Sequence, residues 1–332
     1  MSYKRRLALP IVRLGLLDAY SFLRRWVLGQ EAAILIYHRV GNTIEHSWSH
    51  TSVRIEDFEN QIRYLSSKCH AIPLDELSQY VQEKKPLPKR AIAITFDDGY
   101  KDNYLNAYPI LKRYNMPATI FLTTCHIDTG NLLWDGRVKY ALMNTPLEAF
   151  ELEELGTYPL HSPDERKQAY FSIVPKLKEF QEGEKNLLIE KLVARLGVDI
   201  PGDLGKKVGL SWDEIREMSN NGITFGAHTI THPILTKLSL EEAGKEIIGS
   251  KRRIEEEVDK PVTAFSYPNG EPADFNDDIK QILRQNGFAC AVTVSPHPIT
   301  PRTDLLEMGR ISLGLNLASI KLFPDYIRSQ ML

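Results

Sequence analysis

The chain is poor in cysteine, nearly neutral in net charge and without a long hydrophobic run. Its three cysteines, Cys69, Cys125 and Cys290, are far apart and form no CxxC pair, which excludes a disulfide framework and a cysteine-based metal site and indicates a reducing compartment. A net charge of −2 argues against a nucleic-acid partner, because such proteins usually present a basic surface to the phosphates. With 332 residues and no internal repeat or low-complexity tract, the sequence is that of an ordinary globular protein.

The N-terminal segment is basic and amphipathic. A basic cluster at residues 4–6 precedes an apolar stretch that Arg13 and Asp18 interrupt, so neither a cleavable signal peptide nor a transmembrane helix is predicted. At helical spacing the apolar residues form one stripe, which favours a helix over residues 1–29. This helix either rests on an anionic membrane through residues 4–28 or packs on the protein body. We expect a cytoplasmic protein, peripheral at the membrane in the first case.

The middle of the chain has the pattern of an α/β fold, and its length allows two domains or one barrel with an insertion. Short apolar runs alternate with helical patterns, which is typical of βα units and a mainly parallel sheet. Residues 127–207 are charged, rich in Leu and Glu and without a strand pattern, so they are predicted to form a helical insertion, either a lid or a substrate platform. The predicted strands span residues 32–38, 91–96, 117–123, 222–227, 262–267, 288–294 and 308–313.

Helices are predicted between these strands. Apolar residues at helical spacing predict amphipathic helices around residues 58–65 and 247–258. Ser211 and Glu214 have the spacing of a capping box, which predicts that a helix begins at Trp212.

Two adjacent carboxylates stand where the predicted strand 91–96 ends. Asp97 and Asp98 are followed by Gly99. Side chains alternate along a strand, but at a strand end that enters a glycine turn both can face one cleft. Like charges at that distance need a cation or a shared proton. A plain turn or helix cap is the alternative, because Asp-Gly is common in both, and this motif alone leaves the choice open.

A histidine pair follows the predicted strand 222–227. His228 and His232 are four residues apart in HTITH, so both imidazoles can meet one ion. They occupy the same strand-end position as the aspartates, and the C-terminal ends of barrel strands meet at one face. Two histidines and one carboxylate form the ligand set of a catalytic zinc with a position open for water, although iron, cobalt and other ions accept it too.

These two motifs resemble those of the polysaccharide deacetylases with a NodB-homology domain, carbohydrate esterase family 4. TFDDGY at 95–100 is similar to the first family motif, HTITH at 228–232 to the second, and the order of elements is similar over residues 30–315. The resemblance implies a distorted (β/α) barrel of about seven units. We place this domain at residues 30–320, with the insertion 127–207 outside the minimal domain.

The resemblance also implies a reaction, the metal-dependent removal of N-acetyl groups from an amino-sugar glycan. Asp97 would be the general base, and Asp98, His228 and His232 would hold a divalent metal. Zn²⁺ is the expected ion, with Co²⁺, Fe²⁺ and Ni²⁺ as alternatives. The expected substrate is an N-acetylated polysaccharide or a lipid-linked sugar, and no further cofactor is inferred.

The third family motif, R-x-P-[FY], departs from the pattern here. Its arginine position holds Ser266, within FSYPNG at 265–270. Arg310, on the last predicted strand, is therefore the candidate for orienting Asp97. The SYPNG form looks like a branch that includes exopolysaccharide and poly-N-acetylglucosamine deacetylases. The residues expected at the substrate and oxyanion site are Tyr267, Pro268 and Asn269. Pro268 and Asn269 would shape the pocket, and a backbone N–H of this stretch would be available to the oxyanion.

The histidine that acts as general acid in this family is missing from its usual place, because residues 311–314 contain none. In the poly-N-acetylglucosamine deacetylases this histidine comes from an N-terminal strand, and YHRV at 37–40 looks like that element. His38 is therefore the expected acid. A histidine that only caps the strand is the alternative, and His297 in a proline-rich loop is the rival acid. The histidines expected at the surface are His46, His50, His70, His126 and His161.

Three functional classes remain. The leading one is the glycan deacetylase. The second is a hydrolase of a non-sugar amide or cyclic imide on the same barrel. The third is a catalytically silent glycan-binding module, which would not need the complete set of Asp97, Asp98, His228 and His232. Trp134 and Trp212 are interpreted as packing residues, with stacking of Trp134 on a sugar ring as the alternative.

Overall fold

The computed structural model describes residues 31–42, 48 and 51–312. The N-terminal helix predicted over residues 1–29, His46 and His50, and the domain end predicted at residue 320 lie outside the described residues. Among the helices that are described, none has the length and apolar character needed to cross a membrane.

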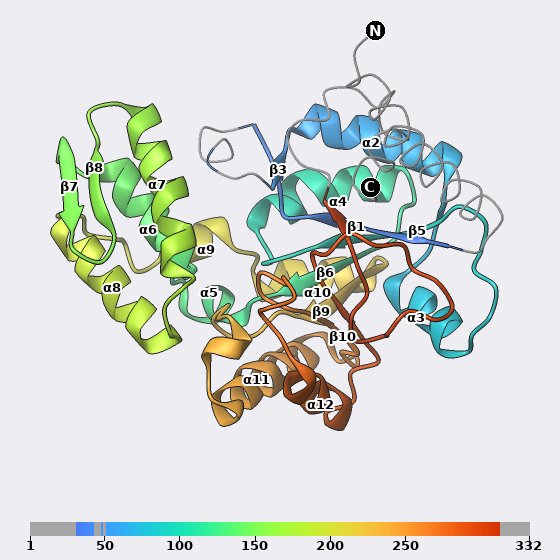
Figure 1. Ribbon diagram of the computed structural model, residues 1–332. Coiled ribbons are helices and arrows are strands. Elements are labelled where there is room, and N and C mark those ends of the chain that lie inside the picture. The colour runs from blue at the N-terminus through green and yellow to red at the C-terminus, as the bar shows by residue number, and fades with distance from the viewer. Residues whose placement is uncertain (1–30, 43–47, 49–50, 313–332) are drawn as a thin grey trace, which may run out of the picture.

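One parallel sheet forms the body of the molecule (Figure 1). Each of the seven predicted strands is present, most of them one to three residues shorter at an end, and the short β4 (His70–Ala71) adds to the sheet beside β5. An isolated parallel bridge joins Val292 to Met308, just before the last strand, so the two edges of the sheet curl toward each other. This confirms the distorted barrel. The strand order is β11 (Cys290–Val292), β10 (Ala264–Ser266), β9 (Ile223–Ala227), β6 (Ala118–Leu122), β5 (Ala91–Phe96), β1 (Ala33–Tyr37) and β12 (Ile311–Ser312).

The long strands of this sheet are apolar along nearly their whole length because they are covered on both faces. Every residue of β1, β5 and β6 is buried, as expected for parallel strands packed between layers. The helices that surround the sheet are α2 (Ile55–Lys68), α3 (Leu74–Gln82), α4 (Tyr108–Arg113), α10 (Trp212–Asn220), α11 (Leu240–Val258) and α12 (Asp277–Gln285). The shorter elements are β2 (Arg39–Val40), β3 (Ser52–Val53), α5 (Thr124–Thr129), α9 (Leu204–Val208), the π-helix η2 (Asn103–Ala107) and the 3₁₀ helix η3 (Leu235–Lys237).

The predicted helical faces are confirmed. Helix α2 buries Phe58, Ile62 and Leu65, and α11 buries Ile247 and Ile254 against the main core. The capping box at the start of α10 is also present: the Ser211 side chain accepts a hydrogen bond from the Glu214 N–H, and the Glu214 carboxylate accepts one from the Ser211 N–H at 2.9 Å.

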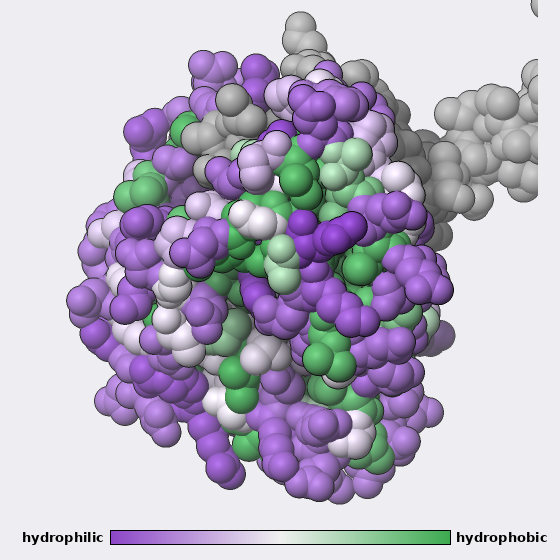
Figure 2. Space-filling model, turned by 90° about the vertical axis from the view of Figure 1, so that its left-hand side faces the viewer, coloured by the Kyte–Doolittle hydropathy of each residue, from purple (hydrophilic) through white to green (hydrophobic). Residues whose placement is uncertain are grey.

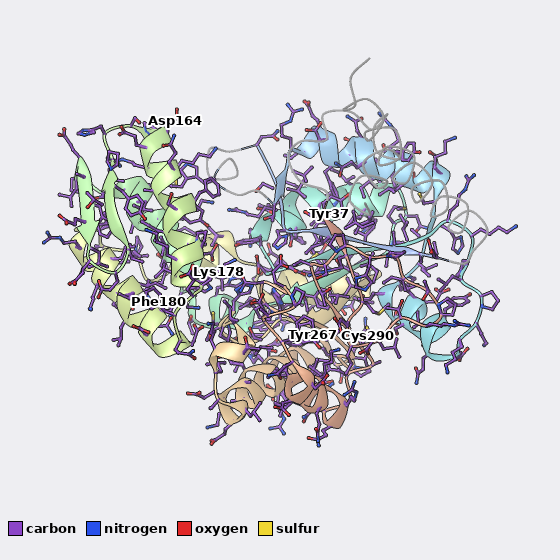
Figure 3. The ribbon with its side chains drawn as sticks, in the orientation of Figure 1. Tyr37, Asp164, Lys178, Phe180, Tyr267 and Cys290 are labelled. Carbon is purple, nitrogen blue, oxygen red and sulfur yellow. The ribbon has the colours of Figure 1, made fainter. Side chains whose placement is uncertain are left out.

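Residues 134–196, within the segment 127–207 predicted as an insertion, form a lobe at one side of the barrel, which we call the helical lobe (Figure 1). Its helices α6 (Trp134–Asn144), α7 (Pro163–Leu177) and α8 (Glu182–Arg195) enclose a hydrophobic core of their own. Figure 3 shows α7 running from Asp164 toward Lys178, which lies nearer the barrel. Viewed from the lobe side, the surface is largely hydrophilic with hydrophobic residues in separate groups (Figure 2).

The prediction that this insertion lacks strands is wrong. An antiparallel hairpin of β7 (Ala149–Leu152) and β8 (Gly156–Pro159) covers part of the lobe. Each strand has only four residues, and Phe150 is the one fully buried side chain among them. So short an alternation does not stand out from a sequence rich in Leu and Glu.

Truncation of a core residue on α11 should destabilise the protein strongly. Ile247 is fully buried, so Ile247→Ala should lower the free energy of unfolding by about 2–5 kcal/mol through lost burial and the cavity left behind. Urea denaturation followed by circular dichroism would measure this. The control is Arg252→Ala on the exposed face of the same helix, expected to change stability by no more than about 0.5 kcal/mol. Equal losses in both variants would contradict the packing described.

Candidate metal and catalytic site

The two aspartates lie at the C-terminal end of β5, in a turn of left-handed backbone. Asp98 has φ = 72° and Gly99 has φ = 74°, a conformation that glycine adopts freely and aspartate tolerates. Because the chain turns here, the two side chains need not point to opposite faces as they would in a regular strand. Asp97 and Asp98 are both buried and line the same cavity. The turn is therefore present, and it places both carboxylates at one cavity.

The histidine pair lies in a tight loop at the end of β9, which is separated from β5 by β6. Thr229 and His232 have φ values of 67° and 63°, and the loop contains no helical turn. The Glu246 carboxylate from α11 accepts hydrogen bonds from the N–H groups of Ile230 at 2.8 Å and Thr231 at 2.9 Å. This brings the imidazole rings of His228 and His232 to 4.8 Å between centroids.

Asp98, His228 and His232 form a cluster suited to a metal ion. Asp98 Oδ1 lies 3.5 Å from Nε2 of each histidine, and the three ligand atoms lie within 4.8 Å of one another. Asp98 Oδ1 is buried and has no hydrogen-bond partner among the described residues. The His228 Nδ1–H donates to the Ser266 carbonyl at 2.7 Å, which leaves Nε2 free as a ligand, as is usual for metal-binding histidine. These residues fit a divalent metal with an open coordination position.

Asp97 is held by Arg310, as the sequence suggested for the missing motif arginine. Arg310 Nη1 donates to Asp97 Oδ1 and Nη2 to Asp97 Oδ2, both at 2.7 Å. Ser266 donates from Oγ to Asp97 Oδ2 at 3.2 Å. Burial alone would raise the pKa of Asp97, but the guanidinium of Arg310 and nearby histidines outweigh it and hold the pKa below its ordinary value. Asp97 is thus ionised at neutral pH.

His38 follows β1 and lies beside Asp97. Strand β1 pairs with β5 so that Tyr37 is opposite Phe96, which places the next residue of each strand side by side. His38 Nε2 is 4.0 Å from Asp97 Oδ2, and its side chain keeps 21% of its surface exposed. The segment is held by its neighbours: Asn103 Nδ2 donates to the His38 carbonyl at 2.8 Å, and Asp102 accepts the Val40 N–H at 3.0 Å.

His297, the rival acid, does not reach this cluster. Its Nε2 accepts the Gly309 N–H at 3.1 Å and lies 3.1 Å from the Glu307 carbonyl. It is not among the residues that line the cavity.

Of the three residues expected from the third motif, only Asn269 lines the cavity. Its side-chain Nδ2 is buried with no hydrogen-bond partner in the described structure. Contrary to the expectation, neither Tyr267 nor Pro268 lines the cavity. The Tyr267 ring stacks on Phe275 at 4.2 Å, its hydroxyl donates to the Leu306 carbonyl and its N–H to the Val292 carbonyl. Side chains alternate at the end of β10, so Tyr267 points away while Ser266 faces Asp97.

The expectation that His126 lies at the surface is wrong. His126 is 1% exposed and lines the cavity, whereas His70 and His161 are exposed as expected. Helix α5 begins directly after β6 and turns His126 inward, and burial lowers its pKa to about 4. The sequence carried no signal for this, because a six-residue helix is too short to show an apolar face.

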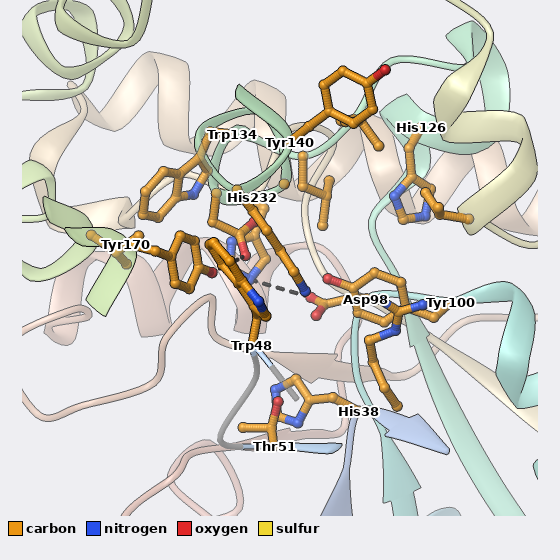
Figure 4. A pocket seen from close by; sticks show the side chains of 18 of the residues that line it. His38, Trp48, Thr51, Asp98, Tyr100, His126, Trp134, Tyr140, Tyr170 and His232 are labelled. Carbon is orange, nitrogen blue, oxygen red and sulfur yellow. Dashed lines mark hydrogen bonds and ion pairs between the residues drawn. The ribbon is translucent and has the colours of Figure 1, made fainter. Parts of the chain in front are cut away.

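A single cavity of about 590 Å³ joins these residues to the helical lobe. Figure 4 shows His38, Asp98 and His232 on the barrel side and Trp134 and Tyr170 on the lobe side. Trp134 is 7% exposed and belongs to the lobe core, so it is a packing residue that also borders the cavity. Trp212 lies elsewhere, with its Nε1 donating to Asp128 at 2.8 Å and Arg253 over its ring. The barrel residues that line the cavity include His38, Asp97, Asp98, His228, His232 and Asn269.

The fold and this cluster define a class of protein, a metal-dependent hydrolase built on a parallel barrel. A family model described as polysaccharide deacetylase matches residues 84–291, more than half of the chain. The protein therefore belongs to the polysaccharide deacetylase family, whose members are generally metal-dependent hydrolases of N-acetylated glycans.

Individual relatives agree. One relative is YxkH from Bacillus subtilis (strain 168), whose name carries a provisional polysaccharide deacetylase assignment. The two sequences are 23% identical over 311 residues, which cover 92% of this chain and 80% of YxkH. A second relative is a poly-β-1,6-N-acetyl-D-glucosamine N-deacetylase from Staphylococcus epidermidis. It is 31% identical to this chain over 185 residues, which cover 53% of this chain and 60% of that protein.

Solved structures share the fold. Streptococcus pyogenes deacetylase PplD has a TM-score of 0.60 at 19% identity, covering 91% of this chain and 98% of that one. IcaB from Ammonifex degensii has a TM-score of 0.57 at 18% identity, covering 92% and 98%.

Removal of Arg310 should destabilise the fold, because it takes from the buried Asp97 carboxylate the guanidinium that donates to both of its oxygens. We expect Arg310→Met to lower the free energy of unfolding by about 3–5 kcal/mol at pH 7, measured by urea denaturation. The loss should shrink as the pH falls toward 4, because a raised Asp97 pKa in the variant lets the carboxyl take up a proton. Ser266→Ala, which removes one neutral donor from Asp97, should cost only about 1 kcal/mol. A loss for Arg310→Met as small as that for Ser266→Ala would refute this account.

Proposed function

We propose that the protein removes N-acetyl groups from an N-acetylglucosamine polymer of the exopolysaccharide type, with Zn²⁺ as its metal. The observation that carries the proposal is that Asp97, clamped by Arg310, lies in the same cavity as the Asp98, His228 and His232 cluster. The activities named for the staphylococcal relatives support the substrate class. An Asp-His-His ligand set with an open coordination position supports zinc as the bound metal.

Asp98 Oδ1 and the Nε2 atoms of His228 and His232 would hold the ion. When bound, it supplies Lewis-acid chemistry that activates water and polarises the acetamide carbonyl. Asp97 is the general base and accepts the proton of the attacking water. Its two hydrogen bonds from Arg310 keep it ionised and fix the direction of its carboxylate, so its basicity depends on this pair.

The leaving amine needs a proton, and His38 is placed to supply it. An amine departs poorly unless protonated, so breaking the C–N bond requires a general acid. His38 lines the cavity beside Asp97 and is partly exposed, which leaves room for the sugar nitrogen. The unpartnered Nδ2 of Asn269 is a donor available to the developing oxyanion. Acetate and a free amino sugar are the products.

We also propose that the protein acts on its substrate at a membrane surface. The basic amphipathic pattern of residues 4–28 supports peripheral contact with an anionic membrane on the cytoplasmic side, where a lipid-linked or nascent glycan would be the substrate. Co-sedimentation of the full chain with anionic and neutral vesicles tests this contact, and equal binding to both would count against it.

The central test is acetate release from β-1,6-linked N-acetylglucosamine oligomers by chelated protein before and after zinc is added. Acetate should appear only with metal. Asp97→Asn should keep the metal, measured by mass spectrometry, but lose about 10²–10⁴-fold in kcat, the usual contribution of a general base. His228→Ala should lose both metal and turnover. Full activity of Asp97→Asn would overturn the base assignment, and failure of the wild type to bind metal would overturn the site.

The assignment of the general acid has a matched pair of variants. His38→Gln should lower kcat by about 10²-fold or more while the metal content stays unchanged, because His38 does not belong to the ligand cluster. His297→Gln should leave kcat close to that of the wild type, because His297 lies outside the cavity. The reverse pattern, a large loss with His297→Gln alone, would transfer the role to that residue.

A further inference from the structure

The cavity does not end at the catalytic cluster but continues onto the helical lobe. Its lobe side is formed by α6 and α7, which pack on each other within the separate lobe core. The reacting acetamide needs only the barrel side of this space. The lobe side therefore raises the question of what else the cavity accommodates. The lobe residues that line the cavity include the polar or aromatic Trp134, Asp135, Lys139, Tyr140, Tyr170 and Lys178, together with apolar ones such as Met143 and Val174.

Trp134 carries a buried donor at this wall. The residue is 93% buried, borders the cavity, and its indole Nε1–H has no hydrogen-bond partner in the described part of the chain. Such a buried, unpaired donor is costly unless a ligand or water completes it. Lys185, which does not border the cavity, lies over one ring face at 4.5 Å from the centroid.

Asp135 and Tyr170 place a polar pair beside this indole. The Tyr170 hydroxyl donates to Asp135 Oδ2 at 3.3 Å, and both residues border the cavity. Asp135 keeps further acceptor capacity, because a carboxylate has about four lone-pair sites. Trp48, from the barrel side of the chain, also lines the cavity, with its ring 5.9 Å from that of Tyr170. Figure 4 shows Trp48, Trp134 and Tyr170 grouped on one side of the cavity.

This combination matches one class of ligand. A sugar ring has an apolar C–H face that packs on aromatic rings and hydroxyls that donate to a carboxylate and accept from an indole N–H. An acyl chain would leave the Trp134 donor unpaired and would not use the remaining acceptor sites of Asp135. We propose that Trp134, Asp135 and Tyr170, with Trp48, form a second sugar subsite, which binds a residue of the glycan next to the one being deacetylated. The inference rests on the proposed function and adds to it the recognition of an oligomer rather than a single sugar.

The subsite predicts that affinity depends on chain length. Isothermal titration of the full-length, zinc-loaded Asp97→Asn protein with β-1,6-linked N-acetylglucosamine oligomers of one to five residues would measure this. We expect the dissociation constant to fall about tenfold or more once the chain spans both subsites, the equivalent of one or two good hydrogen bonds with ring packing. Adding Trp134→Phe, which removes the Nε1 donor, or the isosteric Asp135→Asn should reduce this gain to about threefold or less.

A matched control is available in the lobe. Tyr158→Phe removes a hydroxyl that donates to the Leu155 carbonyl at 2.8 Å on the hairpin, outside the cavity, and should keep the full gain. Asp135→Asn preserves shape, so it remains informative if Trp134→Phe disturbs the lobe core.

The outcomes separate the two proposals. A wild type that releases acetate while both variants keep the full gain with chain length overturns the subsite alone. A wild type whose affinity does not depend on chain length overturns it as well. If the wild type releases no acetate from any oligomer, the proposed function fails and the subsite falls with it.

Discussion

The ion pair between Arg310 and Asp97 is the constraint on which the active-site side of the barrel depends. Arg310 is completely buried and makes five hydrogen bonds, to the Thr293 carbonyl, to Thr95, to both oxygens of Asp97 and to Ser266. Taking two charges out of water is expensive, and only such complete pairing compensates for it. Because these partners lie on β5, at β10 and after β11, the same contacts that orient the carboxylate also fasten the last strand to the sheet. The hydrogen bonds of Arg310 thus both orient the Asp97 carboxylate and hold the last strand to the sheet.

The strand order explains how this chain supplies functional groups from unusual places. Strand β1 lies between β5 and β12, so a residue that follows β1 reaches the same carboxylate as a residue near β12. His38, which follows β1, therefore lies beside Asp97. The same reasoning applies to the guanidinium: Ser266 occupies the motif position, and Arg310 reaches Asp97 from the other side of the sheet.

The barrel and the helical lobe divide the work of the cavity. The barrel holds the charged groups on short turns at strand ends, where residues such as Asp98 and His232 have a left-handed backbone. The lobe has its own hydrophobic core and contributes aromatic and polar side chains from α6 and α7. Loop insertions of this kind are the usual way in which one barrel serves many substrates. The chemistry therefore belongs to the barrel, and the lobe is suited to choosing what enters.

The sequence by itself determined the seven main strands, the Asp-His-His motif residues and the family, because apolar strands and strand-end motifs are local patterns. Asp97, Asp98, His228 and His232 were identified in this way. Only the tertiary structure decided which distant residues meet them: Arg310 is a weak inference from sequence until its two 2.7 Å contacts with Asp97 are seen, and His126 and the β7–β8 hairpin were missed. Tyr267 was misplaced because its direction depends on where β10 ends. Local signals encode which elements form, whereas the packing of strands far apart in the chain sets which side chains share a cavity.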